Sequence, residues 1–300
     1  MKIGIPRALF YHKYSSMYHA FFDKLGVETI VSPKTNRAIL ANGNSLAIDE
    51  SCLSAKIFLG HVAGLVGKCD CIFIPRIENL GSGEVACAKL FALYDIVRNT
   101  LDAKVIGFNI DEINGFTEIK GYITLGKELG FSRRISKNAY LHAKKVQAEN
   151  DKAREEKIAK KLESTKMKIL VLAHAYNSHD EFIGIPVINN LKKLGMEVIL
   201  ASDLSGKYKE LASVYSSTLY WVYNKELVGA MLHLLDKVDG IVIVTAFPCG
   251  PDSLVNELII RKQKKVPMIS LCIDELQGQA GIETRIESFI DILTARRNAQ

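Results

Sequence analysis

The stretch GIVIVTAFPCGPDS, residues 240–253, decides the fold class. Its first six residues are apolar and mostly β-branched, which is typical of a strand buried on both faces of a parallel sheet. Cys249 follows in a short loop, and residues 253–261 have the apolar spacing of a helix. A strand, a loop and a helix in this order form the repeating unit of parallel α/β sheets.

The same alternation continues on both sides of this stretch. In the second half of the chain the pattern predicts strands at 168–173, 197–201 and 267–273, and helices at 186–194, 225–235 and 280–293. In the first half it predicts strands at 2–6, 27–31, 71–74 (closed by Pro75) and 103–108, and helices at 14–25 (ended by Gly26), 52–65 and 87–97. Two sets of βαβ units predict two doubly wound α/β domains with mostly parallel sheets.

A segment rich in Lys, Glu and Ala lies between the two sets, at residues 136–166. Its composition predicts a long polar helix that joins the domains, with its charges facing solvent. We therefore predict an N-terminal α/β domain at 1–135, a helical linker at 136–166 and a C-terminal α/β domain at 167–300.

Composition narrows the class of protein. The 300 residues are 48% hydrophobic and 24% charged, with a net charge of +6. The basic residues alternate with acids and no nucleic-acid motif occurs, so we expect no nucleic-acid partner. No apolar run reaches the roughly 18 to 20 residues of a membrane span, and the opening MKIGIPRALFYHKY reads as a first strand rather than a signal peptide. The sequence therefore predicts a cytoplasmic protein without a membrane partner.

Three of the six cysteines are predicted to open helices. Cys52 follows the loop IDES, Cys87 follows NLGSGEVA, and Cys249 follows the strand at 240–245. Such loops lie at the sheet edge where α/β proteins bind ligands. Helix N-termini favour thiolates, and their N–H groups can hydrogen-bond cluster sulfurs. Three thiolates on a [4Fe–4S] cubane would leave one iron open for a substrate, although a lone buried cysteine often acts simply as a small hydrophobe.

The remaining cysteines and the histidines give weaker signals. No C-x-x-C pair occurs, and a reducing compartment disfavours disulfides. Cys69 and Cys71 are interpreted as structural, while Cys272 is the best candidate for an extra ligand but is interpreted first as a core residue. His174 and His179 follow a predicted strand and either face the ligand crevice or have capping and surface roles. No Walker A, Rossmann, nucleophile-elbow or H-E-x-x-H motif occurs.

Blocks along nearly the whole chain resemble the 2-hydroxyacyl-CoA dehydratase component family, in its stand-alone, activase-related and double-cubane-like branch. The blocks occur in the family's order: KIGIPRALFYHKY, VSPKTNRAIL, DESCLSAKIFLGHV, IFIPRIENLGSGEVACAKLFALYDIVRN, LAHAYN, TLYWVYNKEL, AFPCGPDSLVNELI and IDELQGQAGIETRIESFIDIL. The resemblance implies flavodoxin-like domains, a [4Fe–4S] cluster held by Cys52, Cys87 and Cys249, and an ATP-dependent iron–sulfur activase as electron donor. It also implies that a double cubane is an alternative, which would need six thiolates.

Two motifs depart from the family's pattern. Leu53 and Ser54 follow Cys52 where the family often has C-x-P. The late motif D-E-H-T-G-E-A-G reads DELQGQAG at residues 274–281, so a histidine and a glutamate are replaced. These replacements argue against an acid–base role at those two positions, and they leave the three cysteines unchanged.

Several polar residues near the cysteines are candidates for the pocket. Glu50 and Lys56 flank Cys52, and Arg76 follows the strand that leads to Cys87; these three are the candidate catalytic residues, with an ordinary surface ion pair as the alternative for Lys56 and Arg76. Further candidates are His61 and Glu84. Asp252 and Ser253 are interpreted first as caps of the helix after Cys249.

The sequence leaves three functions open. The first is an iron–sulfur protein that accepts a low-potential electron from the activase and reduces or dehydrates a small, possibly acyl-CoA, substrate, alone or with a homologous second subunit or as a homodimer. The second is a non-catalytic electron carrier or cluster-assembly factor for a partner enzyme. The third is a metal-free binding module in which the cysteines only pack.

Overall fold

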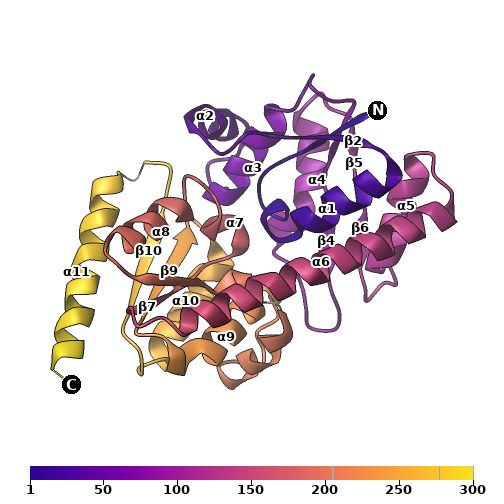
Figure 1. The fold of residues 1–300 in the computed structure, drawn as a ribbon. Coiled ribbons are helices and arrows are strands. Elements are labelled where there is room, and N and C mark those ends of the chain that lie inside the picture. Colours follow the sequence, from indigo (N-terminus) through magenta and orange to yellow (C-terminus); the bar gives the residue numbers. More distant parts are fainter. Residues whose placement is uncertain (205, 277, 300) are drawn as a thin grey trace. The chain divides into compact units, whose positions relative to one another are not determined.

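The computed structural model describes residues 1–204, 206–276 and 278–299. The chain forms two compact units (Figure 1): Met1–Asn150 with Tyr220–Val222, and Asp151–Leu219 with Tyr223–Gln300. The division at residues 150 and 151 falls within α6 (Arg133–Leu162), which confirms the prediction of a long polar helix in this part of the chain. No helix formed by the described residues combines the length and the apolar character that crossing a bilayer requires.

The N-terminal unit is built on a four-stranded sheet with the order β2-β1-β3-β5, and its strand pairs are parallel. A two-stranded parallel sheet, β4-β6, extends it. The strands are β1 (Lys2–Ile5), β2 (Glu28–Val31), β3 (Cys71–Phe73), β4 (Arg76–Asn79), β5 (Val105–Ile106) and β6 (Asn109–Asp111).

β3 ends before Pro75, as predicted, and a separate strand, β4, begins at Arg76 and continues the pairing. Proline has no N–H, but Ile74 N–H donates to the Ile106 carbonyl and Arg76 N–H donates to the Phe108 carbonyl, both at 2.8 Å. The backbone segments at Ile74 and Gly107 also approach closely: a Cβ on Gly107 would lie 2.1 Å from the Ile74 carbonyl oxygen. Of the predicted strand at 103–108, only Val105–Ile106 forms a strand, β5, and β6 begins at Asn109.

Helices cover both faces of the N-terminal sheet (Figure 1). They are α1 (Tyr11–Leu25), α2 (Arg37–Leu46), α3 (Leu53–Ala63), α4 (Ala88–Thr100), α5 (Glu118–Glu128) and α6. On one face, aromatic contacts join α1 and α5, with the Phe21 and Tyr122 rings 4.8 Å apart. α3 and α4 pack against each other. α1 ends as predicted at Gly26, whose φ of 69° is the left-handed conformation of a helix C-cap.

The C-terminal unit repeats the same plan. Its parallel sheet has the order β10-β9-β7-β8 and is formed by β7 (Lys168–Leu172), β8 (Glu197–Leu200), β9 (Gly240–Ala246) and β10 (Met268–Ile273). All seven residues of β9 are buried, as its apolar and β-branched sequence predicts. The helices are α7 (Ala175–Ser178), α8 (Gly184–Lys193), α9 (Val222–Leu234), α10 (Gly250–Lys262) and α11 (Gln279–Asn298), with 3-10 turns η1 (Ala201–Asp203), η2 (Gly206–Val214) and η3 (Leu235–Lys237).

In chain order both main sheets read 2-1-3-4, the beginning of the flavodoxin-like order. The prediction of two doubly wound flavodoxin-like α/β domains with mostly parallel sheets is confirmed. In such sheets the ligand crevice lies where strand order reverses, beyond the carboxyl ends of the first and third strands. These positions are the ends of β1 and β3 in one unit, and of β7 and β9 in the other.

Candidate functional site

Cys52 and Cys87 lie at the same edge of the N-terminal sheet. Cys52 is the N-cap residue of α3, which leads to β3, and Cys87 is the N-cap residue of α4, which leads to β5. A helix that leads to the start of a parallel strand begins at the carboxyl edge of the sheet and ends at the amino edge. Both helices therefore begin at the carboxyl edge, where α/β proteins bind ligands.

Cys249 has the equivalent position in the C-terminal unit. It follows β9 and is the N-cap residue of α10. The side chains of Cys52, Cys87 and Cys249 make no capping hydrogen bond, and the three thiols are reduced and half-buried. The prediction that these three cysteines stand at the starts of helices is confirmed.

The other three cysteines occupy different surroundings. Cys71 is buried in β3, and burial raises the pKa of its thiol. Cys69 is half-buried, donates a hydrogen bond to the Leu65 carbonyl at 3.4 Å and has a pKa that is likewise raised by burial. Cys272 lies on β10, which is an edge strand, and is exposed. Its interpretation as a core residue is therefore wrong.

Asp252 forms the centre of a buried polar cluster beside Cys249. Its Oδ1 lies 2.8 Å from His174 Nε2 and accepts a hydrogen bond of 2.8 Å from Asn224 Nδ2, while the carboxylate also shares a hydrogen bond with the Cys249 thiol. Burial opposes ionisation of Asp252, but the charge and hydrogen bond of His174, with the other two bonds, hold its pKa below the usual value. His174, Asn224 and Asp252 are each 5% exposed.

The capping roles predicted for Asp252 and Ser253 are wrong. The helix begins at Gly250, so Cys249 itself occupies the N-cap position. Asp252 turns inward to His174, and the Ser253 hydroxyl donates to the Cys249 carbonyl at 2.7 Å. Both side chains are thus committed to bonds that the cap interpretation did not anticipate.

The His174–Asp252 pair lies at the strand-order reversal of the C-terminal sheet. His174 follows β7, and Asp252 lies in the first turn of the helix after β9. The Tyr176 ring stacks on the imidazole with centroids 4.9 Å apart. Of the alternatives for His174, a position facing the crevice end of the sheet fits this geometry; its side chain makes no capping bond.

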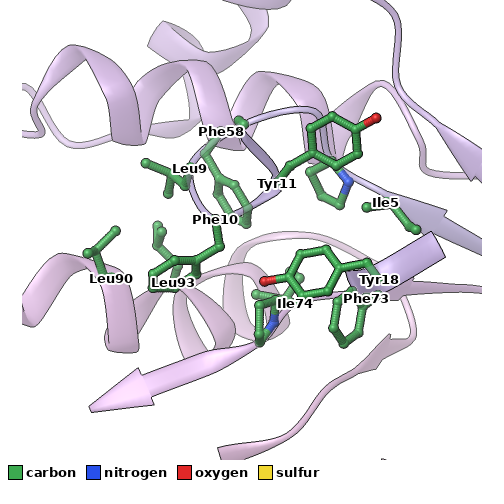
Figure 2. Close-up of a pocket in the computed structure, with 13 residues that line it drawn as sticks. Ile5, Leu9, Phe10, Tyr11, Tyr18, Phe58, Phe73, Ile74, Leu90 and Leu93 are labelled. Atoms are coloured by element: carbon green, nitrogen blue, oxygen red, sulfur yellow. The ribbon is translucent and has the colours of Figure 1, made fainter. Parts of the chain in front are cut away.

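The corresponding region of the N-terminal unit is apolar and nearly filled. Figure 2 shows side chains from the loop after β1, including Leu9 and Phe10, directed toward Ile74 and Leu93. The cavity that remains has a volume of about 20 Å³, enough for roughly one water molecule. Leu9 has a φ of 49°, a conformation that L residues rarely adopt. This reversal point is therefore closed to a larger ligand in the structure described.

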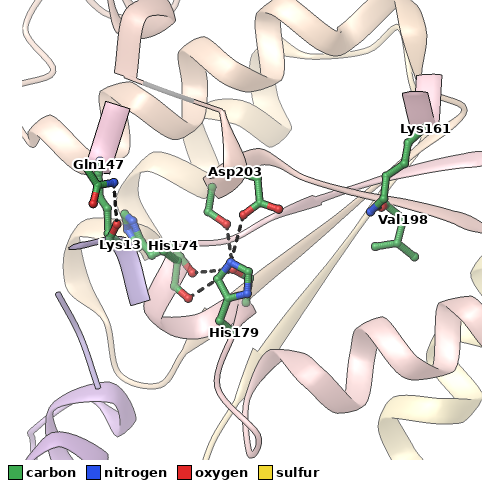
Figure 3. A network of polar contacts seen from close by, with 10 residues as sticks. Lys13, Gln147, Lys161, His174, His179, Val198 and Asp203 are labelled. Atoms are coloured by element: carbon green, nitrogen blue, oxygen red, sulfur yellow. Dashed lines mark hydrogen bonds and ion pairs between the residues drawn. The ribbon is translucent and has the colours of Figure 1, made fainter. Parts of the chain in front are cut away.

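His179 forms a second polar pair in the C-terminal unit. Its Nε2 lies 3.1 Å from Asp203 Oδ1 (Figure 3). Burial opposes ionisation of Asp203, but the hydrogen bond and charge of His179, helped by Arg154 and Lys161, hold the pKa of the carboxyl below its usual value. Lys161 also donates to the Val198 carbonyl at 2.6 Å (Figure 3). Of the alternatives for His179, a capping position fits, because its backbone N–H caps the end of α7, while its side chain forms this half-buried pair.

The three candidate catalytic residues have different environments. Glu50 is exposed, in the loop before Cys52. Lys56 is only 7% exposed, on the buried helix α3. Arg76 forms an ion pair with Asp95 and lies over the Tyr94 ring, 5.1 Å from its centroid. The ion pair considered as the alternative for Arg76 is thus present.

Sequence reasoning placed His61 near Cys52 but missed its partners. The imidazole is fully buried, with Nδ1 2.8 Å from Ser32 Oγ and Nε2 2.9 Å from Thr35 Oγ1. Burial, with the nearby Arg7 charge, lowers the pKa of His61 to about 4. His61 therefore belongs to the region after β2 rather than to the surroundings of Cys52. Glu84 is half-buried in the loop before Cys87, and Gln277 of the late motif lies outside the described residues.

Within the described part of the chain, no three His, Cys, Asp or Glu side chains form a group that could hold a metal ion. Two of the three candidate cysteines belong to the N-terminal unit and one to the C-terminal unit. Each of the three cysteines, considered by itself, has a free, half-buried thiol at a helix N-terminus on the carboxyl side of a parallel sheet. This donor chemistry fits an iron–sulfur cluster, whose ligands are thiolates.

The sequence from residue 2 to residue 204 matches the family model described as the CoA enzyme activase uncharacterised domain. The chain belongs to this family. The match includes Cys52, Cys87 and the whole N-terminal sheet, and it extends through β8 of the C-terminal unit. The activase-related part of the resemblance noted in the sequence is thereby shown, and the narrower relation to the dehydratase component remains a prediction.

Solved structures give only distant similarities to this activase-related chain. The SBP FpvC of Pseudomonas aeruginosa in complex with Mn²⁺ is 15% identical, with 100% of this chain and 99% of that chain covered and a TM-score of 0.27. A variant of Zn(II)-bound AdcAII of Streptococcus pneumoniae is 12% identical (98% and 99% covered, TM-score 0.30), and the laminin-binding protein Lbp of Streptococcus pyogenes is 12% identical (97% and 98% covered, TM-score 0.25). TM-scores this low support no conclusion about fold or function. No curated protein matches the sequence.

Proposed function

We propose that this activase-related protein is an iron–sulfur protein in which Cys52, Cys87 and Cys249 bind a [4Fe–4S] cluster. It accepts an electron from an ATP-dependent activase and reduces or dehydrates a small substrate. The observation that carries the proposal is the position of these three cysteines, each at the N-cap of a helix that begins on the carboxyl side of a parallel sheet. Family membership supports the same system, because the matching domain is activase-related.

The helix starts provide suitable surroundings for the ligands. Cluster binding requires each thiol to lose its proton, and a helix N-terminus stabilises the resulting thiolate through its partial positive charge. The first N–H groups of α3, α4 and α10 have no partner within their own helices, so they are available to sulfur. Asp252, fixed by His174 and Asn224, accepts a hydrogen bond from the Cys249 thiol in the iron-free chain, and this bond is lost when the thiol gives up its proton to bind iron.

Three protein ligands leave one iron of a cubane without a thiolate. When bound, such a cluster supplies one-electron transfer and an open metal position for a substrate oxygen. Glu50 and Lys56, next to Cys52 in sequence, and Arg76, on the strand before Cys87, are the proposed polar surroundings. Lys56 and Arg76 are the residues to orient an anionic group, although Arg76 would first have to leave Asp95.

Anaerobic purification with iron and sulfide analysis tests the proposal. We expect about four irons and four sulfides per chain. Cys52→Ala, Cys87→Ala and Cys249→Ala should each lose most of the iron, whereas Cys69→Ala and Cys272→Ser should keep it. Equal loss in Cys69→Ala would show that the ligand assignment is wrong. Loss in Cys272→Ser would show a fourth thiolate and remove the open iron.

A second measurement separates a catalyst from an electron carrier. The loaded protein, an ATP-dependent activase and a reductant are combined, and the cluster is followed by electron paramagnetic resonance as candidate substrates, including 2-hydroxyacyl-CoA thioesters, are added. Net substrate-dependent reoxidation supports a reductase, whereas formation of dehydrated product without net reoxidation supports a dehydratase, because loss of water consumes no electron. Reduction without any substrate-dependent step supports a carrier or assembly factor, and a protein that never binds iron supports a metal-free binding module.

A further inference from the structure

A cavity of about 400 Å³ lies between α3 and α4 in the N-terminal unit. This volume is within the range of small-molecule sites, roughly 300 to 1,000 Å³. The cavity extends along α4 from Lys89 to Thr100, a helical rise of roughly 16 Å. It therefore has the length and volume for an elongated organic molecule.

Apolar side chains form the inner wall of the cavity. This wall includes Ala55 and Leu59 of α3 and Leu93 of α4, each of which is 3% exposed. Leu46 and Ile48, from the end of α2 and the loop after it, add to the apolar lining, as does Ile96 of α4. This wall can bury an aliphatic or aromatic body by the hydrophobic effect.

The end of the cavity at the carboxyl edge of the sheet is polar and carries positive charge. Ser51 lies immediately before α3 and Lys89 is the second residue of α4, so two helix N-termini and one ammonium group meet this end. Ser51 is 6% exposed, and its hydroxyl has no hydrogen-bond partner among the described residues. The Lys89 ammonium, which lines the cavity, likewise has no ion-pair or hydrogen-bond partner in the described chain.

The other polar groups that line the cavity are already bonded. Asp95 forms an ion pair with Arg76, Asn99 Nδ2 donates to the Asp95 carbonyl at 2.7 Å, and the Thr100 hydroxyl donates to the Ile96 carbonyl at 2.7 Å. Ser51 and Lys89 are thus the groups left to bind the polar end of a ligand, and both can donate to an anion.

We propose that this cavity binds an aliphatic carboxylic acid as the free anion. The carboxylate lies at Ser51 and Lys89, and the hydrocarbon chain lies along Ala55, Leu59 and Leu93. A thioester of the same acid is neutral at this point, so it would leave the Lys89 charge unused. The inference goes beyond the proposed function, because it concerns the N-terminal unit alone and requires no bound cluster.

Calorimetric titration of the purified full chain with octanoate tests the site, with 1-octanol as a neutral probe of the same length. Octanoate should bind about tenfold more tightly than octanol, as expected for one charge-assisted hydrogen-bonded contact. Lys89→Gln should abolish that difference by weakening octanoate alone. Lys127→Gln, at an exposed lysine in the last turn of α5, is the matched control and should keep the difference.

Two variants locate the hydrocarbon chain. Ala55→Leu fills the inner wall and should weaken both probes at least tenfold, provided the variant melts like the wild type. Ile96 lines the cavity at a half-exposed position, where a charged side chain should disturb folding less than in the buried wall. Ile96→Glu should weaken the binding of octanoate more than that of octanol. Loss of octanoate binding in both variants supports the site.

Several results would overturn the proposal. They are the absence of saturable octanoate binding, equal affinities for octanoate and octanol in the wild type, unchanged binding in Lys89→Gln, and unchanged binding in Ile96→Glu. Octanoyl-CoA serves as a final competitor. If it displaces octanoate and binds more tightly, the ligand is a thioester and the assignment of a free acid is wrong.

Discussion

Gly43 and Gly60 meet where α2 crosses α3, and neither position has room for a side chain. A Cβ on Gly43 would lie 1.9 Å from the Lys56 carbonyl oxygen, and a Cβ on Gly60 would lie 1.9 Å from the Ile39 carbonyl oxygen. Both obstacles are backbone atoms, so a larger residue would have to push the two helices apart. Because α3 begins at Cys52, this contact fixes the helix that carries the first proposed ligand.

Gly60→Ala should therefore destabilise the N-terminal unit, by about 2 kcal/mol or more, since overpacking without relaxation costs roughly 1 to 3 kcal/mol. Urea denaturation with limited proteolysis measures the effect and identifies the unit that opens. Gly64→Ala is the matched control on the same helix end, because a Cβ there meets its nearest atom at 3.4 Å and φ is −66°. Equal stability of the two variants would contradict the close crossing of α2 and α3.

His61 should make stability depend on pH. Its pKa is about 4 in the folded chain because of burial and Arg7, whereas the ordinary value is about 6.5. The unfolded chain therefore binds the proton first as pH falls. The stability that neutral His61 contributes is fully present above pH 6.5 and is lost progressively between pH 6.5 and pH 4, to a total of about 3 kcal/mol.

The difference between wild type and His61→Gln isolates this contribution from the titration of carboxylates. The variant should lose less stability than the wild type over the same pH interval, and the exposed His142→Gln should follow the wild type. Ser32 Oγ accepts the Arg7 N–H at 2.8 Å, so its own proton can go to His61 Nδ1 and the imidazole then donates through Nε2 to Thr35. Direct NMR titration that gave an ordinary pKa for His61 would refute this account.

Asp252→Ala should destabilise the C-terminal unit by about 3 kcal/mol. The substitution leaves His174 and Asn224 buried without their shared acceptor, and each buried unsatisfied group costs roughly 1 to 3 kcal/mol. Ser253→Ala, one residue away and exposed, should change stability by less than about 0.5 kcal/mol. Urea denaturation followed by circular dichroism compares the two variants, and similar stabilities would show that the Asp252 cluster contributes little.

Local patterns predicted the strands and the cysteine-bearing helix starts because those features are encoded within a few neighbouring residues. The run at β9 is apolar and β-branched, and Cys249 follows it within one strand-loop-helix unit. Local patterns did not predict α2, because its sequence, RAILANGNSL, contains residues that favour turns. The helix depends instead on the Asn36 side chain, which accepts hydrogen bonds from the N–H groups of Ala38 and Ile39, and on the close contact at Gly43.

Pairs that are distant in sequence could not be predicted in this way. His174 and Asp252 are 78 residues apart, and Ser32 and His61 are 29 residues apart. Only the parallel sheet order brings the first pair to one reversal point, so the polar surroundings of Cys249 followed from the fold and not from a motif. Asp252 likewise resembles a cap in sequence, because its position near a helix start is local and its partners, His174 and Asn224, are distant.

Alkylation of the cysteines should distinguish structural thiols from the proposed ligands. In the iron-free chain under native conditions, Cys71 should react most slowly with iodoacetamide, because it is 2% exposed and burial raises the pKa of its thiol. Iron loading should then protect Cys52, Cys87 and Cys249 together, while exposed Cys272 reacts at the same rate in both forms. Mass spectrometry of the labelled peptides gives each rate. Protection of Cys272 in parallel with the other three would make it a ligand as well, and protection of only one or two of the three would contradict a shared cluster.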